Sequence, residues 1–233
     1  MAWECWRVIG RAIGEVLAFG LGVALSPLAV VALVLMLVSQ NGARPAWAFA
    51  GVWVLSLVVV STVVLLVADG AEASANGAPA SWVSVVKMVI GLLLVVFGVR
   101  RWRGPERRAT VAATPGWMRH LDDVTVPRAA GLAAAFNVVK PKNLLLTIGA
   151  GIAVAQVGAS PAGQASAICV FVVLGSIGLA IPLAIHVLMP SRGRHLLIEL
   201  RDWMVRENAT IIAVLSLVIA AKLLGDALIS LSS

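Results

Sequence analysis

Two polar clusters, each containing a proline, lie within membrane-length apolar runs of this chain: Ser26-Pro27 and Lys140-Pro141-Lys142-Asn143. The lysine and asparagine side chains of the second cluster are hydrogen-bond donors suited to a carboxylate, sulfate or phosphate group. Ser26 offers a hydroxyl that either faces Asn143 or Asn137 or bonds back to its own helix. The chemistry that these residue types predict is the binding of an anion.

Each proline also interrupts the helix around it. Proline has no N–H and displaces the carbonyl four residues earlier, so we expect the carbonyls of Val23 and Asn137 to lose their helical partners. Such groups are tolerated at membrane depth only where they line a cavity or are buried in protein. Paired broken helices are typical of the central site of a transporter. The predicted substrate-binding residues are Ser26, Pro27, Asn137, Lys140, Pro141, Lys142 and Asn143.

The composition indicates an integral membrane protein. The 233 residues are 61% hydrophobic and only 12% charged, which is outside the range of soluble globular domains. The formal charge of +7 comes from arginines in short stretches between apolar segments, so it indicates topology and not a nucleic-acid partner. Cys5 and Cys169 form no C-x-x-C pair, and we interpret both as packing or incidental residues.

Apolar runs of about 20 residues cross a bilayer as helices. We predict six such helices, at residues 13–39, 45–68, 82–100, 129–157, 162–189 and 208–230. The connections 101–128 and 190–207 hold most of the arginines. The positive-inside rule therefore places both connections in the cytoplasm and both termini outside a bacterial inner membrane.

This topology places two lysines deep in the bilayer. Lys140 and Lys142 lie roughly 18–21 Å beyond Arg128 along the helix, within a core about 30 Å thick. An ionisable residue at that depth should face a cavity, an acidic partner or free carbonyls. The alternative, for either lysine, is a side chain that reaches water along the helix.

The chain divides into two similar halves. Residues 1–103 and 129–233 each hold three predicted spans, and residues 104–128 form an arginine-rich cytoplasmic linker. Because three is odd, the second half enters the membrane from the opposite face, as in inverted repeats that support alternating access. A stripe of small residues on the first helix predicts close approach of another helix; it consists of Gly10, Gly14, Ala18, Gly22 and Ser26.

Other ionisable residues lie near the predicted span ends. Lys222 and Asp226 are spaced to pair one turn apart. Glu15 is the candidate for proton coupling, provided that its helix begins before residue 13. The sequence contains no H-E-x-x-H, G-x-S-x-G, P-loop or pair of active-site carboxylates, so we expect no catalysis, cofactor or metal.

Two segments resemble a known family: Ala24–Val30, which reads ALSPLAV, and Pro141–Thr147, which reads PKNLLLT. The chain is similar over nearly its whole length to the peptidoglycolipid-addressing (sulfolipid-addressing) proteins of the lysine exporter superfamily. The resemblance implies a small inner-membrane protein, typical of actinobacteria, that moves cell-wall glycolipids or peptidoglycolipids outward. The family motif Asn-Pro-Lys-Asn falls on residues 140–143. Lys140 replaces its first asparagine, and Asn137 is a candidate for supplying the lost amide.

Three functions follow from these observations. The leading hypothesis is an exporter of an anionic, lipid-linked substrate, with the two broken helices forming the central site. A second is a proton-driven exporter of amino acids or small cations, which requires a buried carboxylate such as Glu15. A third is a membrane accessory that does not itself transport and instead docks lipid-export machinery through its cytoplasmic linkers. The expected partners are the anionic substrate, membrane lipids and that machinery, with homo-oligomerisation left open.

Overall fold

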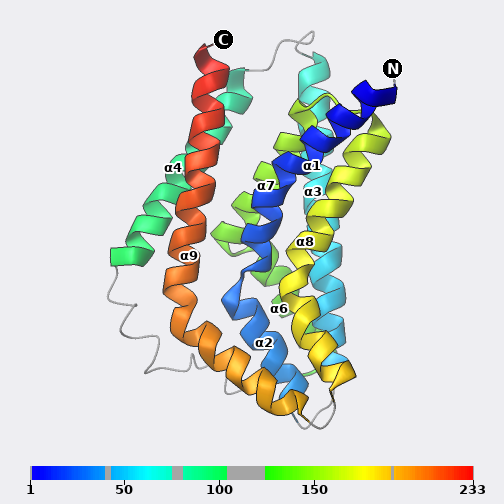
Figure 1. The fold of residues 1–233 in the computed structure, drawn as a ribbon, viewed down its shortest axis with the longest axis vertical. Coiled ribbons are helices and arrows are strands. Elements are labelled where there is room, and N and C mark those ends of the chain that lie inside the picture. The colour runs from blue at the N-terminus through cyan, green and yellow to red at the C-terminus, as the bar shows by residue number, and fades with distance from the viewer. Residues whose placement is uncertain (1, 40–42, 75–80, 104–123, 190–191, 233) are drawn as a thin grey trace.

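The computed structural model describes residues 2–39, 43–74, 81–103, 124–189 and 192–232, and all regular structure in them is α-helical. The predicted linker residues 104–123 lie outside the described residues. The helices, drawn in Figure 1, are α1 (Ala2–Ala24), α2 (Pro27–Val38), α3 (Arg44–Ser74), α4 (Ser81–Arg103), α6 (Val126–Val138), α7 (Pro141–Gln156), α8 (Pro161–Leu188) and α9 (Gly193–Ser232).

Two helices are by themselves long and apolar enough to cross a membrane, over Arg44–Gly70 of α3 and Pro161–Leu188 of α8. Three bent pairs of segments meet the same test together, so the described residues provide up to five spans. The pairs are Ala12–Ala24 with Pro27–Val38, Val126–Val138 with Pro141–Gln156, and Gly193–Glu207 with Thr210–Gly225. In α4 the apolar segment found, Met88–Arg100, is shorter. The prediction of an all-helical membrane protein is confirmed.

Both predicted breaks lie where the prolines place them. The helix axis bends by 53° between α1 and α2 and by 65° between α6 and α7. Ser26 and Lys140, the residues before the prolines, have ψ angles of 87° and 117°, because a following proline disfavours the helical region. Each proline then begins the next helix, where its missing N–H costs no hydrogen bond.

The bundle brings distant parts of the sequence together. In Figure 1, α1 runs beside α8, and α9 runs beside α4 along one edge; the same pairs are in contact. α3 packs against α6 and α7. Both chain ends lie at one end of the bundle, and α2 and the first turns of α9 lie at the other (Figure 1). The two breaks therefore lie between these ends.

Close approach to α1 uses only part of the predicted small-residue stripe. A Cβ atom added at Gly10 or Gly14 would meet no described atom within 4 Å, so this part of the stripe is open. A Cβ at Gly22 would collide with Ile219. The tightest approach comes from α8, where a Cβ at Gly178 would overlap the Ala24 carbonyl oxygen. Glycine is therefore required where α8 meets the first break.

Three predicted boundaries are wrong. Residues 193–207 are not a linker but the first part of α9, because Leu197, Leu200 and Met204 recur at helical spacing. Leu197 and Met204 are buried, in a segment whose helix contacts α2 and α8. α1 begins at Ala2 and not at residue 13, and α3 continues to Ser74 through part of a predicted loop.

Candidate functional site

Side chains of the second break reach backbone and side-chain acceptors of the first. The Asn143 Nδ2 atom donates to the Ser26 hydroxyl at 3.3 Å and to the Phe136 carbonyl at 3.1 Å. The Lys142 Nζ atom donates to the Leu25 carbonyl at 2.9 Å. Of the two asparagines expected to face Ser26, the structure brings Asn143 to it. The release of the Val23 and Asn137 carbonyls stays a prediction, and the carbonyls that accept side-chain donors lie beside them.

A cavity of about 190 Å³ lies between the two breaks. Its lining combines residues of both clusters with side chains of α4 and α9: Ser26, Pro27, Leu28, Phe97, Lys140, Pro141, Lys142, Asn143 and Ile212. Sites for drug-sized ligands usually measure about 300–1,000 Å³. This cavity is therefore large enough for a charged headgroup but not for a whole lipid.

The cavity also receives the amino ends of two helices. Pro27 and Pro141 are the first residues of α2 and α7, and both line it. The first turn of a helix carries N–H groups without helical acceptors and a partial positive charge. Both features favour an anion at this position.

Lys142 is the most strongly buried ionisable side chain of the site. It is only 6% exposed, and an ammonium group has three donors. The Leu25 carbonyl takes one of them. In the part of the chain that the structure describes, Lys142 has no other hydrogen-bond acceptor and no ion-pair partner. An anion in the cavity would supply both.

Lys140 is held differently, against an aromatic ring. Its Nζ atom lies 3.4 Å from the centroid of the Phe136 ring, a cation–π contact. Phe136 meets Phe49 edge to face at 6.0 Å, and Phe49 stacks on Trp53 at 6.2 Å. Because Phe49 and Trp53 are fully buried in α3, the ring that supports Lys140 has little freedom to move.

Asn137, one of the predicted binding residues, does not line the cavity. Its Nδ2 atom donates to the Ser56 hydroxyl at 2.7 Å and to the Trp53 carbonyl at 3.3 Å. This is a correction with a simple cause: Asn137 lies before the 65° bend, on the face of α6 that packs against α3. Its buried Oδ1 atom has no partner among the described residues. Asn137 therefore joins α6 to α3.

Comparison with known proteins addresses the whole chain. A family model described as Sap, sulfolipid-1-addressing protein, matches residues 16–229. The chain belongs to this family. No curated protein and no solved structure matches it. The matched residues include both breaks and every residue that lines the cavity, so the cavity belongs to the part shared with other Sap-family proteins. The expected resemblance to sulfolipid-addressing proteins is confirmed, and membership of the lysine exporter superfamily stays a prediction.

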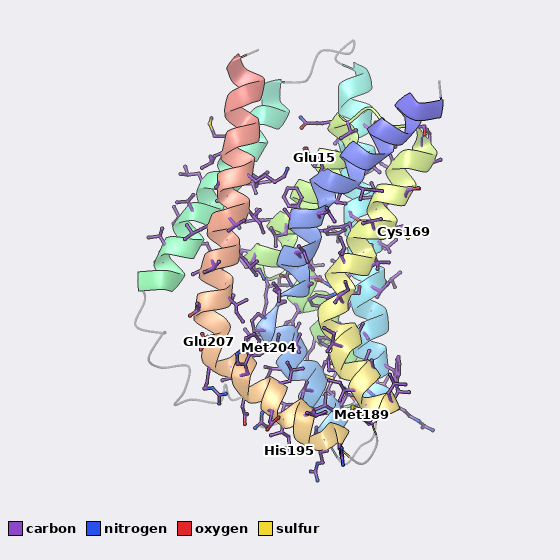
Figure 2. All side chains as sticks on the ribbon, viewed as in Figure 1. Glu15, Cys169, Met189, His195, Met204 and Glu207 are labelled. Atoms are coloured by element: carbon purple, nitrogen blue, oxygen red, sulfur yellow. The ribbon has the colours of Figure 1, made fainter. Side chains whose placement is uncertain are left out.

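Glu15, the coupling candidate in this Sap-family chain, lies outside the cavity. It precedes Ser26 by eleven residues, or about 16 Å along α1, and Figure 2 shows it toward the end where the termini lie. Its carboxylate accepts from Lys222 of α9 at 2.5 Å, with both side chains about a quarter exposed. Lys222 thus pairs across the bundle; the side chain of Asp226, its predicted partner, lies outside the described residues.

Three cavity residues of the Sap-family chain have no signal in the sequence. Leu28, Phe97 and Ile212 are apolar residues within apolar helices, and only the packing of α4 and α9 beside the breaks shows which residues face the cavity. Cys169 is exposed on α8 (Figure 2), so it does not pack in the core as expected. Within the described ranges, no three His, Cys, Asp or Glu side chains gather as a metal site.

Proposed function

We propose that this Sap-family protein is a transporter, or a component of one, that exports an anionic amphiphile such as a cell-envelope glycolipid or peptidoglycolipid. The cavity between the breaks binds the charged headgroup. The observation that carries the proposal is Lys142, a buried cation that lines this cavity and has no carboxylate partner in the described residues. A buried charge without a counter-ion is costly, and an anionic ligand removes that cost.

The family description supports the class of ligand. It names a sulfolipid, which is an amphiphile with an anionic sulfur–oxygen group. Donors from Lys142 and Asn143, together with two helix amino ends, match such a group in charge and in hydrogen bonding. The acyl chains need not enter the protein, because Leu25 and Val139 next to the breaks are 36% and 73% exposed. Their apolar surface suits lipid chains.

The packing of the helices supports the inverted repeat that we include in the proposal. An exchange of the two halves replaces α1, α2, α3 and α4 by α6, α7, α8 and α9. Under this exchange the contact of α1 with α8 becomes that of α6 with α3, and the contact of α2 with α9 becomes that of α7 with α4. All four contacts are present. Two halves that pack alike around a central site suit alternating access.

We place the molecule in the inner membrane with both termini outside and the arginine-rich connections in the cytoplasm. In support, both chain ends lie at one end of the bundle and α9 begins at the other (Figure 1). The residues that precede and open α9 include Arg192 and Arg194. Positive residues accumulate on the cytoplasmic side of membrane proteins.

Reconstitution of the purified protein into liposomes tests the proposal. A fluorescent anionic glycolipid is placed in one leaflet, and its movement is measured with a membrane-impermeant quencher. We expect the wild type to move the lipid and Lys142→Met to slow it at least about tenfold, the effect of losing one charged hydrogen bond. Arg128→Met is the matched control, since Arg128 is an exposed cation of α6 outside the cavity.

Two results would count against this function. If Lys142→Met moved the lipid as fast as Arg128→Met and the wild type, the buried cation would have no part in binding. If the wild type itself moved no lipid but was recovered from cells with a larger exporter, the accessory role would be favoured. Transport of an amino acid that was abolished in Glu15→Gln would favour the proton-coupled alternative.

A further inference from the structure

A second cavity, of about 280 Å³, lies where the end of α2, the end of α8 and the start of α9 meet. Leu37 and Val38 line it from α2, His186 and Met189 from α8 and the residue after it, and Arg194 and Leu197 from α9. We name it the terminal cavity. Figure 2 shows Met189 at this end of the bundle, far from Glu15. It is therefore separate from the cavity between the breaks.

The depth of the terminal cavity follows from the length of α2. Leu37 lies ten residues beyond Pro27, about 15 Å along the helix. A hydrocarbon core is about 30 Å thick, so a site about 15 Å from a central break lies at the level of the lipid headgroups. In the membrane placement proposed above, this is the cytoplasmic leaflet.

The chemistry of the terminal cavity suits an anion with an apolar neighbour. Arg194 offers a planar fork of donors that matches phosphate, and the His186 imidazole adds a further polar group. The acids of the same segment are engaged elsewhere: Glu199 with His195 at 3.2 Å and Asp202 with Arg201 at 2.7 Å. Arg194 has no carboxylate partner in the described chain, so its charge is available to a ligand.

The surface beside the terminal cavity suits lipid chains. On α8, Ile181, Val187 and Leu188 are 50%, 58% and 77% exposed. They lie within the last two turns before Met189, which lines the cavity. An arginine at the headgroup level next to an exposed apolar helix surface fits an amphiphile better than a free anion.

The walls of the terminal cavity are held in place without a ligand. The Gly193 N–H donates to the Met189 carbonyl at 2.6 Å, and a Cβ at Gly193 would come within 3.0 Å of the Ile185 carbonyl oxygen. The start of α9 is therefore fixed to the end of α8. Leu197, one turn later, is buried and anchors the same segment. A preformed site binds without an ordering cost.

We propose that the terminal cavity binds the phosphate headgroup of an anionic phospholipid from the adjacent leaflet, with its acyl chains along α8. The Arg194 guanidinium contacts the phosphate, and His186 contacts the phosphate or the glycerol oxygens. This inference goes beyond the proposed function, because it concerns a membrane lipid and a site separate from the central cavity. It depends on the placement of the helices in the bilayer but not on transport.

Lipid retention by the purified protein tests this site. The protein is exchanged into mixed micelles that contain phosphatidylglycerol or phosphatidylcholine with identical chains, and bound lipid is measured by native mass spectrometry. We expect phosphatidylglycerol to be retained and phosphatidylcholine to be lost. The variant Arg194→Gln with His186→Gln should weaken retention at least about tenfold, as the loss of a charged hydrogen bond predicts. Arg206→Gln, an exposed arginine of the same segment outside the cavity, should retain lipid like the wild type.

Three outcomes would overturn the proposal: equal retention of both lipids, equal losses in the Arg194 and Arg206 variants, or displacement of phosphatidylglycerol by millimolar inorganic phosphate. The first two indicate general attraction to the membrane, and the third a site for free anions. Thermal unfolding of each variant shows whether it is folded, and His186→Gln alone serves if the double variant is not. Lys142→Met should retain phosphatidylglycerol whether or not it transports, which separates this site from the proposed function.

Discussion

The Lys142 ammonium group donates to the Leu25 carbonyl at 2.9 Å, so a side chain of the second break occupies a backbone acceptor of the first. These residues are 117 positions apart in the sequence. Their contact means that neither break can change its geometry without affecting the other. The central cavity is formed by both breaks together, and we expect its variants to affect both helix pairs.

The amide of Asn143 should contribute more to stability than the hydroxyl that it contacts. Asn143→Leu removes two hydrogen bonds and leaves the buried Phe136 carbonyl without this donor, a loss of about 2–4 kcal/mol at about 1–2 kcal/mol for each. Ser26→Ala removes one bond and should cost about 1 kcal/mol. Thermal unfolding in detergent measures both. A larger effect of Ser26→Ala than of Asn143→Leu would contradict the role given to Asn143.

Gly178 should tolerate no side chain. A methyl group there overlaps the Ala24 carbonyl oxygen, so Gly178→Ala must push α8 away from the first break at a cost of about 1–3 kcal/mol. Gly51→Ala is the matched control, because a Cβ at this helical glycine meets nothing within 4 Å. The control should be stabilised by up to about 1 kcal/mol. Equal melting temperatures for the two variants would show that α8 is not seated on the carbonyl.

The ion pair of Glu15 with Lys222 should act as a structural link between α1 and α9. Glu15→Gln and Lys222→Met each leave a partly buried charge without its partner, whereas the double variant leaves none. We expect the double variant to be more stable than the sum of the single losses predicts, by about 0.5–3 kcal/mol. A double-mutant cycle in chemical unfolding measures this coupling. Strict additivity would mean that the two groups do not interact.

Lys140 should set the preference of the central cavity for highly charged headgroups. Lys140→Asn restores the asparagine of the family motif and removes a cation from the cavity lining. We expect binding of a sulfated or phosphorylated glycolipid to weaken about tenfold, as for the loss of one charged hydrogen bond, and binding of an uncharged glycolipid to stay unchanged. Competition for a fluorescent lipid measures both affinities. An equal effect on both lipids would show that the substitution alters the shape of the cavity and not its charge.

The parts of the fold that depend on local backbone chemistry were predictable. Pro27 and Pro141 located both breaks, because the loss of an N–H and the restriction on the preceding residue act within one turn. The meeting of Ser26 with Asn143 was also within reach, since both lie at a break. The start of α9 at Gly193 was missed because arginines were taken as a sign of a loop, although Leu197 and Met204 keep a helical spacing.

The remaining parts depend on helix rotation, which sequence alone does not reveal. Asn137 is only three residues before Lys140, yet it faces α3 and not the cavity. Phe97 and Ile212 face the cavity although nothing distinguishes them from the apolar residues around them. In a helix that is apolar on every side, periodicity does not identify the inner face. Those side chains required the structure.

The contact between Gly178 and the Ala24 carbonyl also bears on how the bundle moves. Gly175, one turn earlier on α8, is close enough to α1 that a Cβ would meet Val23 at 3.3 Å. Where two helices touch through glycine, no interlocking side chains oppose translation of one along the other, which is the shear type of motion. α8 can therefore slide past the first break over a short distance without repacking its neighbours. That surface is where we expect the smallest resistance when the protein exchanges between inward-open and outward-open forms.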